Sequence, residues 1–122
     1  MDHKTVEEYV LEMPNAVREY PFGEGVAVYK VEDKMFALIT EGKLPVQLSL
    51  KCDPQLATIL REKYETVMPG YHLNKKHWNT IILSGQMPWE EVQDLIRHSY
   101  NLITGVTEIS PELTKGKKRS KR

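Results

Sequence analysis

The chain has 122 residues, of which 40% are hydrophobic and 28% charged, and its 17 basic side chains balance its 17 acidic ones. This length suits one folded domain, and the composition excludes collagen-like, disulfide-stapled and wholly disordered chains. The charge is unevenly distributed along the chain, because six basic residues lie within the last eight positions. Residues 1–114 therefore hold 11 basic and 17 acidic groups, a net charge of −6. This excludes a uniformly basic protein that coats nucleic acid.

The first predicted element is a helix that ends at Pro14. Thr5 and Glu8 have the spacing of a capping box, with Thr5 as the N-cap, and apolar side chains recur at helical spacing over residues 6–13. Proline disfavours helical geometry in the residue before it, so the helix stops there. Residues 15–25, which contain a proline and two glycines, are typical of a connecting loop.

Three strands joined by short turns are expected next. Apolar and polar side chains alternate over residues 26–31 and 34–40, with a tight turn at 32–33 between them. The third strand alternates cleanly over residues 46–51, which predicts that Ser49 and the other side chains of its polar face lie in water. Consecutive strands with short turns indicate an antiparallel meander.

A second helix is predicted to begin at Asp53 and Pro54, because aspartate is a good N-cap and proline suits the first helical position. Its buried side is expected to comprise Leu56, Ala57, Ile59, Leu60 and Tyr64. Residues 66–76 read as irregular, and a fourth strand is predicted over residues 78–83.

Pro88 is predicted to open a last long helix, with Glu90 and Glu91 near its positive end and Gly105 as its C-cap. The inner side of this helix is expected to comprise Val92, Leu95, Ile96, Ser99, Leu102, Ile103 and Val106.

The order α-β-β-β-α-β-α predicts an α+β fold in which helices pack on one face of an antiparallel sheet. The apolar pattern fades beyond residue 106, and the chain ends in the basic run KGKKRSKR. We therefore expect one domain over residues 1–106 and a disordered basic tail over residues 107–122. The tail could bind a polyanion without regard to sequence, or it could simply keep the protein soluble.

Cellular location follows from what the sequence lacks. The single cysteine, Cys52, cannot form an internal disulfide, which points to a reducing compartment. No apolar run approaches the roughly 18 residues of a membrane span, and the N-terminus has no apolar core of a signal peptide. These features predict a cytoplasmic protein with no membrane partner.

The densest group of polar and aromatic side chains lies in residues 71–79. Lys75 and Lys76 could bind phosphates, an aromatic ring of Tyr71 or Trp78 could stack on a base, and the asparagines could donate hydrogen bonds. The alternative interpretation is a solvated loop entering a strand, with Trp78 in the core and the lysines in water.

Neither a metal site nor an active site is expected. The histidines and the cysteine lack the spacing of metal ligands, and we predict no cofactor. Cys52 precedes a helix start, where the dipole could lower its pKa, and Ser99 would need His72 or His77 brought to it by the fold. Since the chain has no phosphate-binding loop and no nucleophile motif, a non-enzymatic protein is predicted.

The segment PGYHLNKKHWN at residues 69–79 resembles the YjbR-like family, also called MmcQ/YjbR. The resemblance extends over residues 3–105 through the matching segments at residues 20–23, 34–37, 50–54 and 99–100. It implies a small bacterial α+β domain with a fold like that of frataxin and CyaY. Members of the family are commonly labelled DNA-binding. The acidic cluster of the first helix is too modest to support the iron handling that a frataxin-like shape could suggest.

The resemblance implies a shared polar patch as the nucleic-acid-binding site, made of Lys51, His72, Asn74, Lys75, Lys76, His77 and Trp78. Two features oppose strong DNA binding: the net charge of the body, and the lack of a helix with a row of side chains suited to the major groove. We therefore expect weak, salt-dependent binding of DNA or another nucleic acid. The alternative is a protein-interaction module that uses the open face of the sheet or the 66–76 loop, with the tail giving only non-specific affinity for polyanions.

Overall fold

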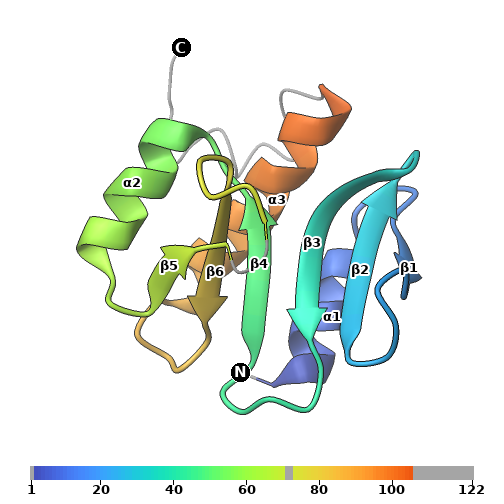
Figure 1. Cartoon of the computed structure of the whole chain (residues 1–122), viewed down its shortest axis with the longest axis horizontal. Helices are drawn as coiled ribbons and strands as arrows, with labels where there is room; N and C mark the ends of the chain where they lie inside the picture. The colour runs from blue at the N-terminus through green and yellow to red at the C-terminus, as the bar shows by residue number, and fades with distance from the viewer. Residues whose placement is uncertain (1, 71–72, 106–122) are drawn as a thin grey trace.

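The computed structural model describes residues 2–70 and 73–105, and within them the chain forms an α+β fold of three helices and a six-stranded antiparallel sheet (Figure 1). In chain order the elements are α1 (His3–Leu11), β1 (Val17–Glu19), β2 (Val26–Val31), β3 (Lys34–Thr40), β4 (Gln47–Lys51), α2 (Pro54–Lys63), β5 (Val67–Pro69), β6 (Trp78–Ile82) and α3 (Trp89–Thr104). The predicted fold class is confirmed. Residues 106–122, which include the predicted tail, lie outside the described residues.

The strand order in the sheet is β1-β2-β3-β4-β6-β5, with every neighbouring pair antiparallel. The predicted meander is confirmed as β2, β3 and β4. In the turn between β2 and β3, Glu32 and Asp33 both have positive φ, as a two-residue hairpin of matching twist requires. After α2 the chain returns to the sheet, so β6 lies beside β4.

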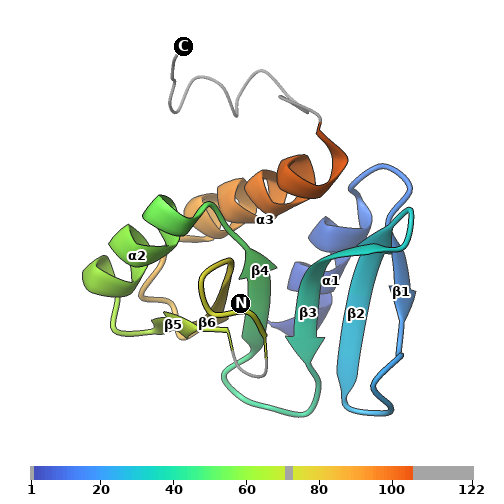
Figure 2. The same cartoon turned by 45° about the horizontal axis from the view of Figure 1, so that its top comes forward.

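All three helices lie on the same side of the sheet, with α3 running behind its centre (Figures 1 and 2). The main core lies between the two layers, and fully buried side chains from both layers meet there, among them Val6, Val10, Tyr29, Ile39, Leu48, Ile81, Val92 and Ile96. This core forms because each helix turns one apolar stripe toward the sheet and each strand turns every second side chain toward the helices.

The other face of the sheet carries a smaller apolar cluster of Val28, Leu38 and Trp78, against which Leu73 packs. The prediction that Ser49 lies in water is wrong, because only 9% of its surface is exposed. Its hydroxyl instead forms a 2.8 Å hydrogen bond with that of Thr80 on β6. A hydroxyl pair of this kind lets polar side chains occupy a buried position.

The start of α1 also differs from the prediction. The helix begins at His3, and the carboxylate of Asp2 accepts a 2.8 Å hydrogen bond from the backbone N–H of Thr5. Asp2 is therefore the N-cap, and Thr5 lies inside the first turn. Two short strands were not predicted: β1 lies within the expected loop 15–25, and β5 within the expected irregular stretch 66–76.

The capping predictions for the other helices are confirmed. The carboxylate of Asp53 accepts hydrogen bonds from two N–H groups of α2, and Gly105 ends α3 in the left-handed conformation at φ 77°. Two core predictions are wrong, since Ile59 is 56% exposed and Leu102 is 43% exposed. Tyr100, which was not predicted to be buried, is 5% exposed and donates a hydrogen bond to a loop carbonyl after α1.

Candidate functional site

The candidate site is a loop, residues 73–77, together with the end of β4 beside it. The loop is closed at its base, where the N–H of Gly70 donates a 2.8 Å hydrogen bond to the carbonyl of Trp78. A Cβ on Gly70 would lie 2.7 Å from the Cβ of Trp78, which is closer than two non-bonded carbon atoms approach in proteins. Glycine is therefore needed for the two chain segments to meet.

Asn74 orders the tip of the loop. Its side-chain oxygen accepts a 3.0 Å hydrogen bond from the N–H of Lys76, and its carbonyl accepts a 3.2 Å bond from the N–H of His77. Asparagine favours such turns because its side chain can mimic a backbone acceptor. As a result Lys75 and Lys76 are both exposed on a fixed turn. The Lys75 ammonium bends back to within 3.3 Å of the Gly70 carbonyl oxygen.

Arg61 of α2 holds this loop against the helix, and the sequence interpretation missed it. Its Nε donates a 2.7 Å hydrogen bond to Asn79 Oδ1, and its Nη2 donates to the carbonyls of Lys75 and Trp78. Asn79 is 2% exposed, and its amide also donates to the Ala57 carbonyl at 3.3 Å. Asn79, which was expected to contact a ligand, is therefore buried and forms its hydrogen bonds within the protein. No local sequence signal marks Arg61, because its partners lie 14 to 18 residues away.

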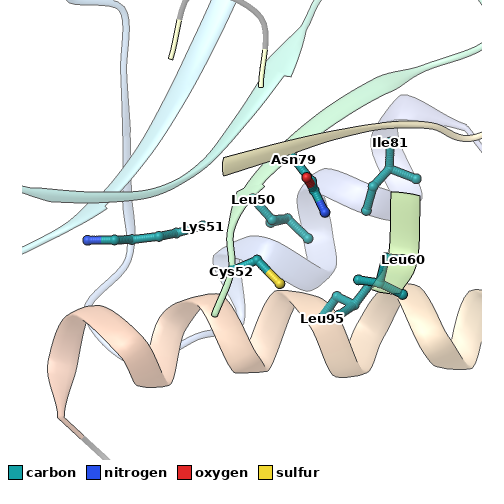
Figure 3. Close-up of a pocket in the computed structure, with 7 residues that line it drawn as sticks. All are labelled: Leu50, Lys51, Cys52, Leu60, Asn79, Ile81 and Leu95. Carbon is teal, nitrogen blue, oxygen red and sulfur yellow. The ribbon is translucent and has the colours of Figure 1, made fainter. Parts of the chain in front are cut away.

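The fold brings Lys51 next to this loop. Lys51 pairs with Trp78 in the register of β4 and β6, and one residue later the N–H of Cys52 donates a 2.7 Å hydrogen bond to the carbonyl of His77. Lys51 is half-buried, and its side chain extends away from the interior around Cys52 (Figure 3). The structure thus joins Lys51, Lys75 and Lys76 on adjoining segments.

Trp78 and the histidines differ in their surroundings. Trp78 is 7% exposed and belongs to the smaller apolar cluster, so its ring anchors the loop and exposes too little surface for a base to stack on it. His77 is half-buried at the end of the loop. His72, also predicted to contact nucleic acid, lies outside the residues that the structure describes.

The two candidate nucleophiles are enclosed. Cys52 is 3% exposed, and burial raises the pKa of its thiol to about 12, so it stays protonated at neutral pH. It borders a cavity of about 10 Å³ between β4, β6, α2 and α3 (Figure 3). Ser99 is fully buried, donates to the carbonyl of Phe36 at 2.5 Å and accepts from the N–H of Lys51 at 3.0 Å. Its hydroxyl therefore both donates to and accepts from the backbone.

Metal-binding groups do not gather in residues 2–70 and 73–105, where no three histidine, cysteine or carboxylate side chains are close enough to hold an ion. His98 instead accepts a 3.1 Å hydrogen bond at Nε2 from the N–H of Asp53. The same part of the chain contains no helix that is both long and apolar enough to cross a membrane.

The charges are unevenly distributed. Two ion pairs with carboxylates lie at α1, β1 and β2, where Arg18 contacts Glu7 and Lys30 contacts Glu19. Within the described part of the chain, none of the lysines at the end of β4 or on the loop takes part in one. The nearest carboxylate in sequence, Asp53, is engaged in capping α2.

Comparison with known proteins identifies relatives over most of the chain. The family model YjbR matches residues 11–102. The chain is 35% identical over 101 residues to the uncharacterized protein YbdF of Escherichia coli O157:H7, which covers 83% of both chains. It is 36% identical over 93 residues to the uncharacterized protein YjbR of Escherichia coli K12, covering 76% of this chain and 79% of that one.

Two solved structures support the same relationship. Protein DR2400 of Deinococcus radiodurans matches 93% of this chain and 85% of its own length, with a TM-score of 0.80 and 35% identity. A crystal structure of a Pseudomonas syringae protein matches 84% of this chain and 98% of its own length, with a TM-score of 0.72 and 28% identity.

Proposed function

This chain belongs to the YjbR family, and from that premise we propose that it is a small, non-enzymatic bacterial module of the cytoplasm that binds nucleic acid. The proposed contact surface, called the loop surface below, comprises Lys51, Asn74, Lys75, Lys76 and His77, with His72 as a further contact proposed from sequence. The likeness to frataxin and CyaY belongs to the same proposal and concerns the fold alone.

One observation carries the proposal: the end of β4, with Lys51, adjoins a hydrogen-bonded loop that carries Lys75 and Lys76, and none of these lysines forms an ion pair among the described residues. Because the backbone of the loop is already ordered, binding a phosphate costs little backbone entropy, and the ammonium groups need not first break an internal ion pair. The negative body opposes the approach of a polyanion, so we expect a dissociation constant on the order of 10⁻⁴ to 10⁻⁶ M at physiological salt.

The roles of the individual residues follow from their geometry. Lys51, Lys75 and Lys76 would contact phosphates. Asn74 would hold the turn, and the buried Trp78 would anchor it. Because the tryptophan ring is covered, binding would depend on charge more than on stacking, and it would discriminate little between sequences.

A protein-interaction module is the second candidate, and a hollow beside the loop favours it. This hollow is lined by Pro54, Gln55, Thr58, Ile59, Arg61 and Lys76. Within this lining Ile59 is an exposed apolar side chain, of the kind that a protein partner could cover. Under this alternative, nucleic-acid affinity would come from the tail alone.

The test compares full-length protein with the double variant Lys75→Ala/Lys76→Ala. A fluorescent single strand and a fluorescent hairpin duplex are each titrated at low salt. We expect the double variant to bind roughly tenfold more weakly, since each exposed contact with a phosphate contributes up to about 1 kcal/mol. Lys43→Ala/Lys63→Ala removes the same charge from exposed positions outside the loop surface and should change binding much less.

Three outcomes would count against the proposal. If full-length protein binds neither probe at low salt, nucleic-acid binding is rejected. If the two double variants weaken binding equally, the loop surface is not the contact. If an Ile59→Ser variant loses a stoichiometric protein partner while nucleic-acid binding is unaffected by all these changes, the second candidate is favoured.

A further inference from the structure

A groove opens where β3 and β4 separate. Their ladder runs from Thr40 opposite Gln47 to Ala37 opposite Leu50, and beyond that pair the strands diverge in front of α3 (Figure 1). Ser99 of α3 occupies the gap, because its hydroxyl accepts a hydrogen bond from the N–H of β4's last residue and donates one to a β3 carbonyl. The helix thereby substitutes for the missing strand-to-strand bond.

The next turn of α3 provides the floor of this groove. Residues three and four positions beyond Ser99 lie on the same side of a helix, and these are Leu102 and Ile103. Together with Met35 of β3 and Trp78 of β6 they line a space of about 410 Å³, within the usual range for small-ligand sites. Leu102 is 43% exposed, so an apolar side chain faces the solvent at this place.

Two lysines complete the lining. Lys34 begins β3 and Lys51 ends β4, and no carboxylate side chain contributes to the groove. Neither lysine forms an ion pair within the described part of the chain. An apolar floor flanked by two unpaired ammonium groups is complementary to a molecule with an apolar body and an anionic group.

We propose that this groove, which we call the β3–β4 groove, binds a small amphipathic anion: a short acyl or aryl chain that carries one carboxylate or phosphate. The apolar chain would lie on Met35 and Leu102, and the anionic group would lie between Lys34 and Lys51. This proposal goes beyond nucleic-acid binding and does not depend on it, although Lys51 belongs to both surfaces.

A purely structural role for the lysines makes a different prediction. The carbonyl end of α3 is partly negative, and nearby cations stabilise such an end. In that case lysine variants would lower stability but would not distinguish an anionic from a neutral ligand. Ligand selectivity therefore separates the two explanations.

The experiment follows the fluorescence of Trp78 in full-length protein. The chain has two tryptophans, so a Trp89→Phe background leaves Trp78 as the only one. Octanoate, octyl phosphate and 1-octanol, which share one alkyl chain, are each titrated below their solubility limits. We expect a saturable change in Trp78 emission with at least one of the anions, and binding of 1-octanol at least threefold weaker than that anion. The stronger anion identifies the carboxylate or phosphate class.

In the same background, Lys34→Ala/Lys51→Ala should weaken binding of the preferred anion roughly tenfold, as the loss of two exposed charge contacts implies. Lys43→Ala/Lys63→Ala should leave it unchanged. Because Leu102 is exposed, Leu102→Gln is expected to fold and to weaken binding about threefold through loss of the apolar floor. Thermal melts confirm that each variant is folded, and if the lysine variant does not fold, Leu102→Gln decides.

The proposal is overturned if no anion gives a saturable change, or if 1-octanol binds as well as the anions. It also fails if folded Lys34→Ala/Lys51→Ala or Leu102→Gln retains full affinity. All these readouts are made without nucleic acid, so their failure leaves the proposed nucleic-acid function to be judged by its own titrations.

Discussion

Arg61 holds the loop that carries Lys75 and Lys76 in place, although it is not among the residues that would contact phosphate. Its guanidinium bridges a buried amide and two backbone carbonyls. We predict that Arg61→Ala lowers the free energy of unfolding by about 1–3 kcal/mol, because Asn79 is left buried without a donor to its oxygen. Urea denaturation measures this change.

Lys43→Ala is the matched control for Arg61→Ala, since it removes one exposed cation that has no hydrogen bond to the loop. Its stability should stay within about 0.5 kcal/mol of the natural chain. A loss of equal size in both variants would mean that Arg61 acts through net charge and not through the bonds to Asn79 and the loop.

Gly70 is the second residue on which the loop depends. A methyl group there would meet the Cβ of Trp78 at 2.7 Å and that of Leu73 at 3.2 Å. We predict that Gly70→Ala destabilises the protein by about 1–3 kcal/mol, as overpacking does when backbone segments must separate. The measurement is the urea midpoint, with near-ultraviolet circular dichroism reporting the environment of Trp78. An unchanged midpoint would show that the two segments can part without cost.

These residues show what local sequence could and could not predict at the site. Lysines beside an asparagine and after Pro69-Gly70 are expected to be exposed on an ordered turn, and Lys75 and Lys76 are so placed. The contacts of Arg61 with Asn79 could not be predicted, because they join α2 to β6 through the tertiary fold. Spacing along the chain carries no information about such a pair.

At the scale of elements, long periodic segments were predicted well and short edge segments were not. β2, β3 and α3 have enough alternation or helical periodicity for their type to be clear. β1 and β5 have three residues each, and β1 is exposed throughout, so neither has an alternating pattern to detect. Ile59 and Leu102 fit the apolar stripe of their helices but face the hollow beside the loop and the β3–β4 groove.

The junction of α3 with the start of α2 predicts a pH-dependent stability. His98 accepts a hydrogen bond from the N–H of Asp53, which requires a neutral imidazole. Burial lowers the pKa of His98, and this effect outweighs the opposing effect of the Asp53 carboxylate. As the pH falls, His98 is therefore protonated first in the unfolded chain, near the ordinary histidine pKa of about 6.5. The stability contributed by His98 is complete above that value and is lost as the pH falls through it toward the lower pKa of the folded state.

Urea unfolding at pH 8 and pH 5.5 tests this link. The natural chain should lose up to about 1.4 kcal/mol per pH unit within the window between the two pKa values of His98. His98→Gln keeps an acceptor but does not titrate, so its stability should fall less between the same two pH values. Equal losses in the two proteins would assign the pH dependence to other groups, such as the remaining histidines.

At the scale of the whole molecule, charge is divided between the folded domain and the end of the chain. Residues 1–114 carry a net charge of −6, and residues 115–122 carry six basic side chains. The acidic side chains are spread along the chain, whereas the loop surface holds three lysines and no carboxylate. Affinity for nucleic acid measured on the whole chain therefore combines a fixed local surface with a separate basic segment.

Salt dependence separates these two contributions. The logarithm of the association constant falls with the logarithm of salt concentration, with a slope of about −0.7 per neutralised phosphate on a single strand. Lys75→Ala/Lys76→Ala should make the slope less steep by roughly 1.4, or two phosphates, in full-length protein. Removing residues 115–122 should make the slope still less steep, while a melt confirms that the shortened chain is folded.

If the shortened chain keeps a salt-dependent slope, and Lys75→Ala/Lys76→Ala makes that slope less steep, the domain itself contacts the nucleic acid. If removal of the tail abolishes binding at low salt, the loop surface has no affinity of its own, and polyanion binding belongs to the tail.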